Sequence, residues 1–136
     1  MDFDLPAIDT KARSEKGVAM QVKTLSGAPL LNSKRDGVFL TLLGPDSDTY
    51  RALYRSQVRK SVELRAAGKE PDAAEEEKGL IDFLVALTTG WEGMLDKAGE
   101  PIPFSAEAAR ELYTRFPVIR DQADTFSASR ANFTSG

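Results

Sequence analysis

The sequence contains neither cysteine nor histidine. Without cysteine there is no disulfide framework and no thiolate nucleophile. Histidine supplies most general acid and base catalysis and most transition-metal ligands near neutral pH. An enzyme built from this chain would have to use paired carboxylates, a lysine or carboxylate-held magnesium. The composition therefore predicts a protein that is not an enzyme and that needs no cofactor and no metal.

Long apolar runs and an excess of positive charge are also missing. No run of about 18 apolar residues is present, which is the length that a transmembrane helix requires. The first nine residues are acidic, where a secretory signal would be basic and then apolar. The formal net charge is -3, whereas a protein that coats duplex nucleic acid needs a basic face to displace counterions. We expect a cytoplasmic protein without membrane contact, and we do not expect nucleic acid as its main partner.

The length and the balance of residue types predict one globular domain over residues 1–136. With 41% hydrophobic and 29% charged residues, the chain has the composition of a folded domain. Residues 1–16 mix charged side chains with Pro6, which predicts a flexible arm, and residues 134–136 predict a frayed tail.

Residues 17–43 have the pattern of a β-hairpin. Apolar and polar residues alternate from Val18 to Lys23, which is the period of a half-buried strand. A second strand is expected over residues 38–43, where both faces carry apolar residues. Because a lone hairpin is marginally stable in water, it must pack on helices, gain another strand or pair with a neighbouring subunit.

Four helices are expected after the hairpin, at about residues 46–67, 72–89, 105–116 and 117–131. Helix-start signals precede them: Gly-Pro-Asp-Ser-Asp at residues 44–48, then Asp72, Ser105 and Pro117. Residues 80–87 are apolar almost all round, which predicts that the second helix is the most buried one. The expected fold class is α+β, mainly α-helical.

The first of these helices carries a row of arginines beside an apolar stripe. Arg51, Arg55 and Arg59 recur every four residues. The stripe consists of Tyr50, Leu53, Tyr54, Val58 and Val62. A charged row on a helix is ordinarily a solvated face. The alternative is a charged contact face for an acidic protein segment or for nucleic acid.

An acidic run begins the second helix, with Glu75, Glu76 and Glu77 after the capping Asp72. Consecutive carboxylates point in different directions around a helix, so this run does not predict a magnesium site.

A succession of turn, cap and aromatic residues runs through the second half of the chain. It comprises Gly90, Trp91, Gly93, Asp96, Gly99, Pro101 and Phe104-Ser105, then Phe116-Pro117, and then Arg130-Ala131-Asn132-Phe133. In the first half, Leu43-Gly44-Pro45-Asp46-Ser47-Asp48 precedes a helix that begins with Tyr50 and Arg51. Over about residues 38–133, this succession resembles the tail assembly chaperones of long-tailed bacteriophages and prophages.

The resemblance implies a protein without enzymatic activity. Such chaperones bind the tape-measure protein, keep it soluble, help to recruit tail-tube subunits and are absent from the finished virion. The resemblance also implies action in the cytoplasm of the bacterial host and self-association, and in many cases a longer product made by frameshifting. The family is mainly helical, so the hairpin at residues 17–43 departs from it.

A tape-measure protein is a long amphipathic helix, so a chaperone for it needs an apolar groove. We expect the client contacts among the apolar residues of the last two helices and of the tryptophan segment: Trp91, Phe104, Leu112, Phe116 and Phe126. The same residues would serve a self-contained core, because large apolar side chains are mostly buried.

Other functions fit the same sequence. One is a structural phage component, such as a head-tail connector or a minor tail protein. Another is a DNA-binding regulator that uses the arginine row. The third is a nuclease or glycosidase that uses carboxylates.

Overall fold

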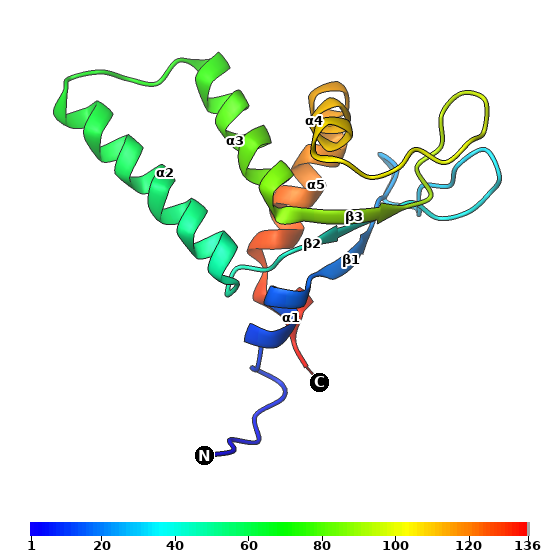
Figure 1. Ribbon diagram of the computed structural model, residues 1–136, viewed down its shortest axis with the longest axis horizontal. Helices are drawn as coiled ribbons and strands as arrows, with labels where there is room; N and C mark the ends of the chain where they lie inside the picture. The colour runs from blue at the N-terminus through cyan, green and yellow to red at the C-terminus, as the bar shows by residue number, and fades with distance from the viewer. Residues whose placement is uncertain (136) are drawn as a thin grey trace.

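The computed structural model describes residues 1–135, in which helices pack on a small antiparallel sheet (Figure 1). The strands are β1 (Val18–Gln21), β2 (Phe39–Leu42) and β3 (Thr88–Glu92), in the order β1-β2-β3. The helices are α1 (Lys11–Lys16), α2 (Asp48–Ala66), α3 (Ala73–Leu87), α4 (Ala106–Arg115) and α5 (Pro117–Ala128), followed by the 3-10 helix η1 (Arg130–Phe133). The predicted α+β, mainly α-helical fold is confirmed.

The predicted hairpin forms the first two strands of the sheet. β1 and β2 are antiparallel, with Met20 opposite Leu40 and Val18 opposite Leu42. Met20, Leu40 and Leu42 are buried, whereas Phe39 and Thr41 on the other side are only half-buried. The two strands therefore have one fully covered face, and the expected cover on the other side of the second strand is partial, because Leu43 is buried there while Phe39 and Thr41 are half-buried.

β3 was not predicted, because residues 88 and 89 were assigned to the end of a helix. In the structure α3 ends at Leu87, and Thr88 already has extended dihedral angles, with φ of -87° and ψ of 122°. Thr88, Thr89 and Trp91 have side chains that favour a strand, and Gly90 disfavours the interior of a helix. Leu40 of β2 pairs with Trp91 of β3, so the hairpin gains the additional strand that it needed.

The core is centred on α3, as the apolar run at residues 80–87 predicted. The side chains of Ile81, Phe83, Leu84 and Leu87 are all buried. They form one cluster with buried residues of the sheet, α4 and α5. These residues are Met20, Leu40 and Leu42 of the sheet, Ala109 and Tyr113 of α4, and Ile119 and Ala123 of α5.

The helix ends differ slightly from the predicted bounds. α2 begins at Asp48 because the side chain of Ser47 accepts a hydrogen bond from the backbone N–H of Tyr50 at 3.1 Å. Asp72 and Ser105 cap α3 and α4 in the same way. The last helix was expected to run to residue 131. It stops at Ala128, and η1 then turns Phe133 into the core, where it is fully buried.

The predicted flexible arm at residues 1–16 is only partly an arm. Residues 11–16 form α1, and Ser14 in this helix is fully buried. The backbone N–H of Gly44 donates to the carbonyl oxygen of Ser14 at 3.0 Å. This close approach is possible because Gly44 has no side chain, since a Cβ there would overlap the Ser14 hydroxyl.

The predicted frayed tail at residues 134–136 is fixed at one position. The backbone N–H of Ser135 donates to the carbonyl oxygen of Asp9 at 3.0 Å. Residue 136 lies outside the described residues.

Tyr113 of α4 ties α4 to the end of α3. Its hydroxyl lies 2.6 Å from Oγ1 of Thr88, which donates to the carbonyl oxygen of Leu84 at 2.7 Å. Burial raises the pKa of Tyr113 to about 12. The unfolded chain binds this proton more weakly, with a pKa near 10. The tyrosine therefore stabilises the fold fully below pH 10, and this contribution is lost as the pH rises toward 12.

We expect Tyr113→Phe to lower the free energy of unfolding by about 1 kcal/mol at pH 8, because one buried hydrogen bond is lost. Above pH 10, the wild-type protein should lose stability more steeply than the variant, by about 1.4 kcal/mol per pH unit. Urea unfolding of both proteins at pH 8 and pH 11 measures this difference. Parallel pH dependence of the two proteins would contradict it.

Candidate protein-binding surface

The start of α2 is fixed firmly to the body of the protein. The buried Ser47 hydroxyl donates to the carbonyl oxygen of Gly44 at 2.7 Å. The carboxylate of Asp46 accepts two hydrogen bonds from the Arg130 guanidinium, both at 2.9 Å, and one from the Thr10 hydroxyl. These bonds, first of all those from Arg130, hold the pKa of Asp46 below its ordinary value. The N-terminal and C-terminal parts of the chain thus meet at the base of α2.

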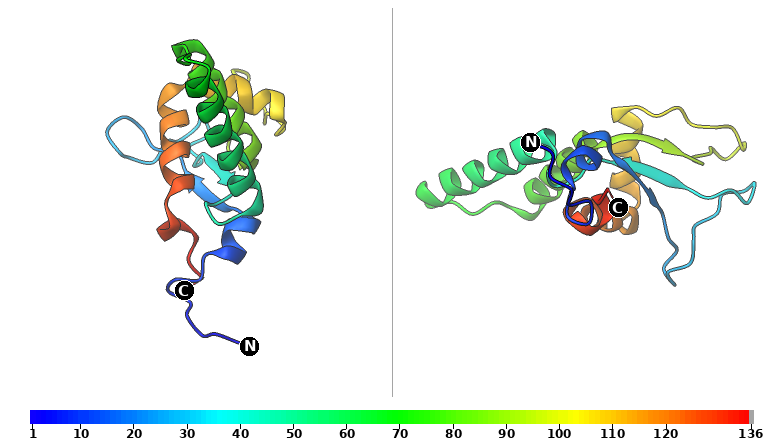
Figure 2. Two further views of the ribbon diagram at one scale, coloured as in Figure 1. Left: turned by 90° about the vertical axis from the view of Figure 1, so that its left-hand side faces the viewer. Right: turned by 90° about the horizontal axis from the view of Figure 1, so that it is seen from below.

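The rest of α2 projects away from the body. None of its residues is buried, Figure 1 shows α2 and α3 diverging from a common base, and the right view of Figure 2 shows α2 extending away from the sheet. Near this base the rings of Tyr50 and Phe83 meet edge to face, with centroids 5.0 Å apart. At the far end Gly68, with φ of +70°, allows the backbone N–H of Lys69 to close the helix on the carbonyl oxygen of Leu64 at 2.8 Å.

An apolar row lies open on this projecting helix. Tyr54 is 57% exposed, Val58 is 46% exposed and Val62 is 59% exposed. Their four-residue spacing places them on one face. The sequence identified the stripe to which they belong, and its other members, Tyr50 and Leu53, do pack against the core. What the sequence did not show is that no element of the described chain covers the outer three residues. Exposed apolar groups that adjoin one another mark interaction sites.

The arginine row flanks the apolar row. Arg51, Arg55 and Arg59 are all exposed, and none of them forms an ion pair within residues 1–135. The row begins beside Asp48, whose pKa is lowered mainly by its hydrogen bond from Lys11 and, to a smaller extent, by Arg51 and Arg55. We call Tyr54, Val58 and Val62 together with these three arginines the α2 face.

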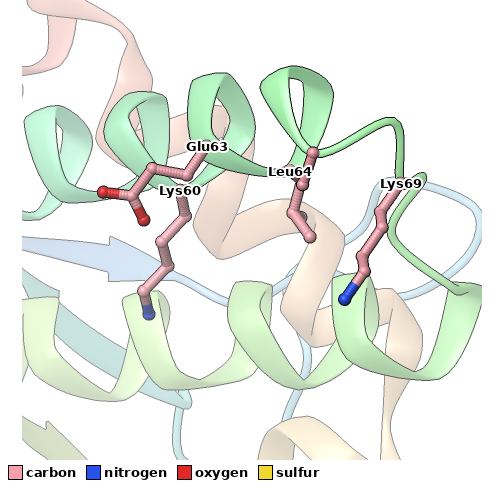
Figure 3. Close-up of a pocket in the computed structure, with 5 residues that line it drawn as sticks. Lys60, Glu63, Leu64 and Lys69 are labelled. Carbon is pink, nitrogen blue, oxygen red and sulfur yellow. The ribbon is translucent and has the colours of Figure 1, made fainter.

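The space between α2 and α3 is hollow. A hollow of about 720 Å³ runs between Leu53, Gln57 and Leu64 on α2 and Glu75, Gly79 and Leu80 on α3. A second hollow of about 330 Å³ lies at the end of α2, where Lys60, Leu64 and Lys69 point toward α3 (Figure 3). The wall on α2 carries Lys60, and the wall on α3 carries Glu75 and Glu76. A side chain of either charge could therefore find a partner in this cleft.

The structure does not gather the five predicted client contacts on one open surface. Trp91 and Phe104 contact each other edge to face at 5.2 Å, and the Trp91 indole N–H donates to the carbonyl oxygen of Ile102 at 2.8 Å. Phe126 contacts Phe133 instead, at 5.7 Å. Trp91, Phe104, Leu112 and Phe126 are partly buried against the core. Phe116 alone among the five is exposed, at 44%, with the Arg115 guanidinium 5.4 Å from its ring centroid.

Neither hollow between α2 and α3 includes any of these five residues. Whether they contact a client stays a prediction.

Two further features bear on the kind of site. Residues 1–135 hold no group of three or more carboxylates that is arranged to bind a metal ion. Over the same residues, no helix is both long enough and apolar enough to cross a membrane.

The comparisons with known proteins identify a phage family. No curated protein and no solved structure matches the chain. The sequence profile of one family, described as YdaY prophage protein, matches residues 45–136, which is more than half of the chain. The matched part begins at the base of α2 and includes the whole α2 face and the α2–α3 cleft. The chain belongs to the YdaY prophage protein family.

Proposed function

We propose that this protein is a phage tail assembly chaperone that binds the tape-measure protein and helps to recruit tail-tube subunits during tail morphogenesis. It acts without enzymatic activity in the cytoplasm of the bacterial host and leaves before the virion is complete. Membership of a prophage family supports a role in phage biology. The observation that carries the proposal is the α2 face, an open apolar row on a projecting helix.

The α2 face suits a helical client. An amphipathic helix that lies along α2 would bury Tyr54, Val58 and Val62, which are spaced like the contacts of two packed helices. Acidic groups of the client would meet the free arginines on the same face. Self-association of the chaperone would set several α2 faces along one long client.

We expect Val58→Asp to weaken binding of the tape-measure protein of the same phage by at least about tenfold, because it places a charge in the centre of the apolar row. Co-purification after co-expression, followed by titration of the isolated proteins, measures the loss. Leu25→Asp is the matched control, because Leu25 is 88% exposed in the β1–β2 connection, far along the chain from α2. Both variants should keep the melting temperature of the wild-type protein, since both sites are exposed.

Two results would contradict the assignment. If Val58→Asp binds normally and Phe116→Ala does not, the client surface lies at the junction of α4 and α5. If neither the wild-type protein nor any variant binds the tape-measure protein, the proposed function is wrong.

Two other roles are distinguished by simple measurements. A head-tail connector or a minor tail protein would be recovered in stoichiometric amounts from purified virions, where a chaperone would be missing. A DNA-binding regulator is favoured by the three unpaired arginines of α2. It would bind duplex DNA with an affinity that falls steeply as salt is added.

A further inference from the structure

A second group of exposed apolar residues lies near the N-terminus of the chain. In residues 1–9, Phe3 is 78% exposed, Leu5 is 55% exposed and Ile8 is 73% exposed. The backbone hydrogen bonds of residues 1–8 are two local turns, in which the N–H of Ile8 donates to the carbonyl oxygen of Leu5 at 3.1 Å and the N–H of Asp9 donates to that of Pro6 at 3.4 Å. Asp2, Asp4 and Asp9 make this segment acidic. It is therefore an apolar and acidic peptide that nothing in the described structure covers.

The charge of this segment is complementary to that of the α2 face. The apolar row on α2 is bordered by three unpaired arginines, and the apolar residues of the segment alternate with aspartates. Pairing of two α2 faces from two copies would instead bring arginine rows together, which like charges oppose. Of the surfaces that this chain itself offers, the N-terminal segment fits the α2 face best.

The segment also starts at the right place. Thr10 donates a hydrogen bond to Asp46, and the Lys11 ammonium lies 2.9 Å from the Asp48 carboxylate at the first residue of α2. Eight extended residues span up to about 26–29 Å. From Asp48 to Val62 the helix rises only about 21 Å. The segment can therefore reach every residue of the α2 face.

We propose that residues 1–8 dock on the α2 face of their own chain, with Phe3, Leu5 and Ile8 covering Tyr54, Val58 and Val62. The segment extends away from α2 in Figure 1, which is the open arrangement. A tether of one or two residues holds the segment at a millimolar effective concentration, which favours the same chain over a second copy. The proposal concerns this chain alone and does not depend on any client.

The absence of cysteine allows a direct test with the full chain. In the variant Leu5→Cys/Val58→Cys, mild oxidation should form a disulfide within one chain, seen as an unchanged monomer mass on a non-reducing gel and a loss of two hydrogens by mass spectrometry. The rate should not depend on protein concentration, and it should exceed that of Leu5→Cys/Leu25→Cys by at least about tenfold. A second pair, Ile8→Cys/Tyr54→Cys, repeats the test, and all five positions are exposed.

A charge exchange tests the role of the arginines. Arg51→Glu, Arg55→Glu and Arg59→Glu together should slow crosslinking of the cysteine pair, and adding Asp2→Lys and Asp4→Lys should restore it. Crosslinked dimers whose rate rises with concentration would overturn the proposal in favour of a second copy. Equal rates for the test pair and the control pair would overturn it altogether. Because the client is absent from these experiments, failure here leaves the proposed function untouched.

Discussion

Phe133→Ala is expected to lower the free energy of unfolding by about 3–5 kcal/mol, the usual cost of removing a fully buried phenylalanine. The Phe133 ring is fully buried, contacts Phe126 and lies beside Gly44, where a Cβ would come within 2.7 Å of the ring. It therefore joins the end of the chain to the residues that start α2. Domains of this size are stable by only about 5–15 kcal/mol, so this one residue accounts for a large part of the total.

Phe116→Ala is the matched control, because it removes the same atoms from an exposed position. Its expected cost is about 1 kcal/mol or less, including the contact with Arg115. Urea unfolding followed by the fluorescence of Trp91, the single tryptophan, gives both values. Equal losses in the two variants would mean that the C-terminal turn is not part of the cooperative core.

Elements whose first residue or buried face is determined by neighbouring residues in the sequence were predicted well. The apolar run at residues 80–87 identified the central helix, and Ser47, Asp72 and Ser105 do cap the helices that they were expected to cap. The pairing of residues 18–21 with residues 39–42 followed from alternation of apolar and polar residues. For the caps and for the buried face of the central helix, the deciding interactions lie within a few residues along the chain, and for the hairpin the alternation identifies the strand before it pairs with its neighbour.

What the sequence did not show depends on distant contacts. α1 is too short to be stable alone, and it is held by contacts of Ser14 with Gly44 and of Thr10 with Asp46, more than 25 residues away in sequence. β3 is defined by its pairing with β2.

The exposure of the candidate residues could not be predicted from the sequence for a related reason. Sequence patterns find apolar faces, but they do not show which faces the fold leaves uncovered. The Trp91 set is mostly packed against the core, whereas the outer part of the α2 stripe is open.

Gly93→Ala is expected to be among the most damaging single-methyl changes in the chain. Gly93 has φ of +82°, a conformation that costs an alanine about 1–2 kcal/mol. A Cβ there would also overlap the carbonyl oxygen of Gly37 and lie 3.1 Å from its carbonyl carbon. Backbone atoms cannot rotate away as a flexible side chain can, so a further overpacking cost of about 1–3 kcal/mol follows. The expected total loss is about 2–5 kcal/mol.

Gly99→Ala separates the two contributions, because Gly99 has the same φ of +82° and its added Cβ would approach nothing nearer than Lys34 Cε at 3.9 Å. The difference between the two variants in urea unfolding therefore measures the close approach of residues 37 and 93. That approach, together with the bond from Asn32 Nδ2 to the carbonyl oxygen of Gly93 at 3.0 Å, holds the β1–β2 connection against the end of β3. If Gly93→Ala lowers the free energy of unfolding no more than Gly99→Ala does, the segments around residues 37 and 93 can separate without loss of stability. The third strand would then be held by its pairing with β2 alone, without support from the connection beside it.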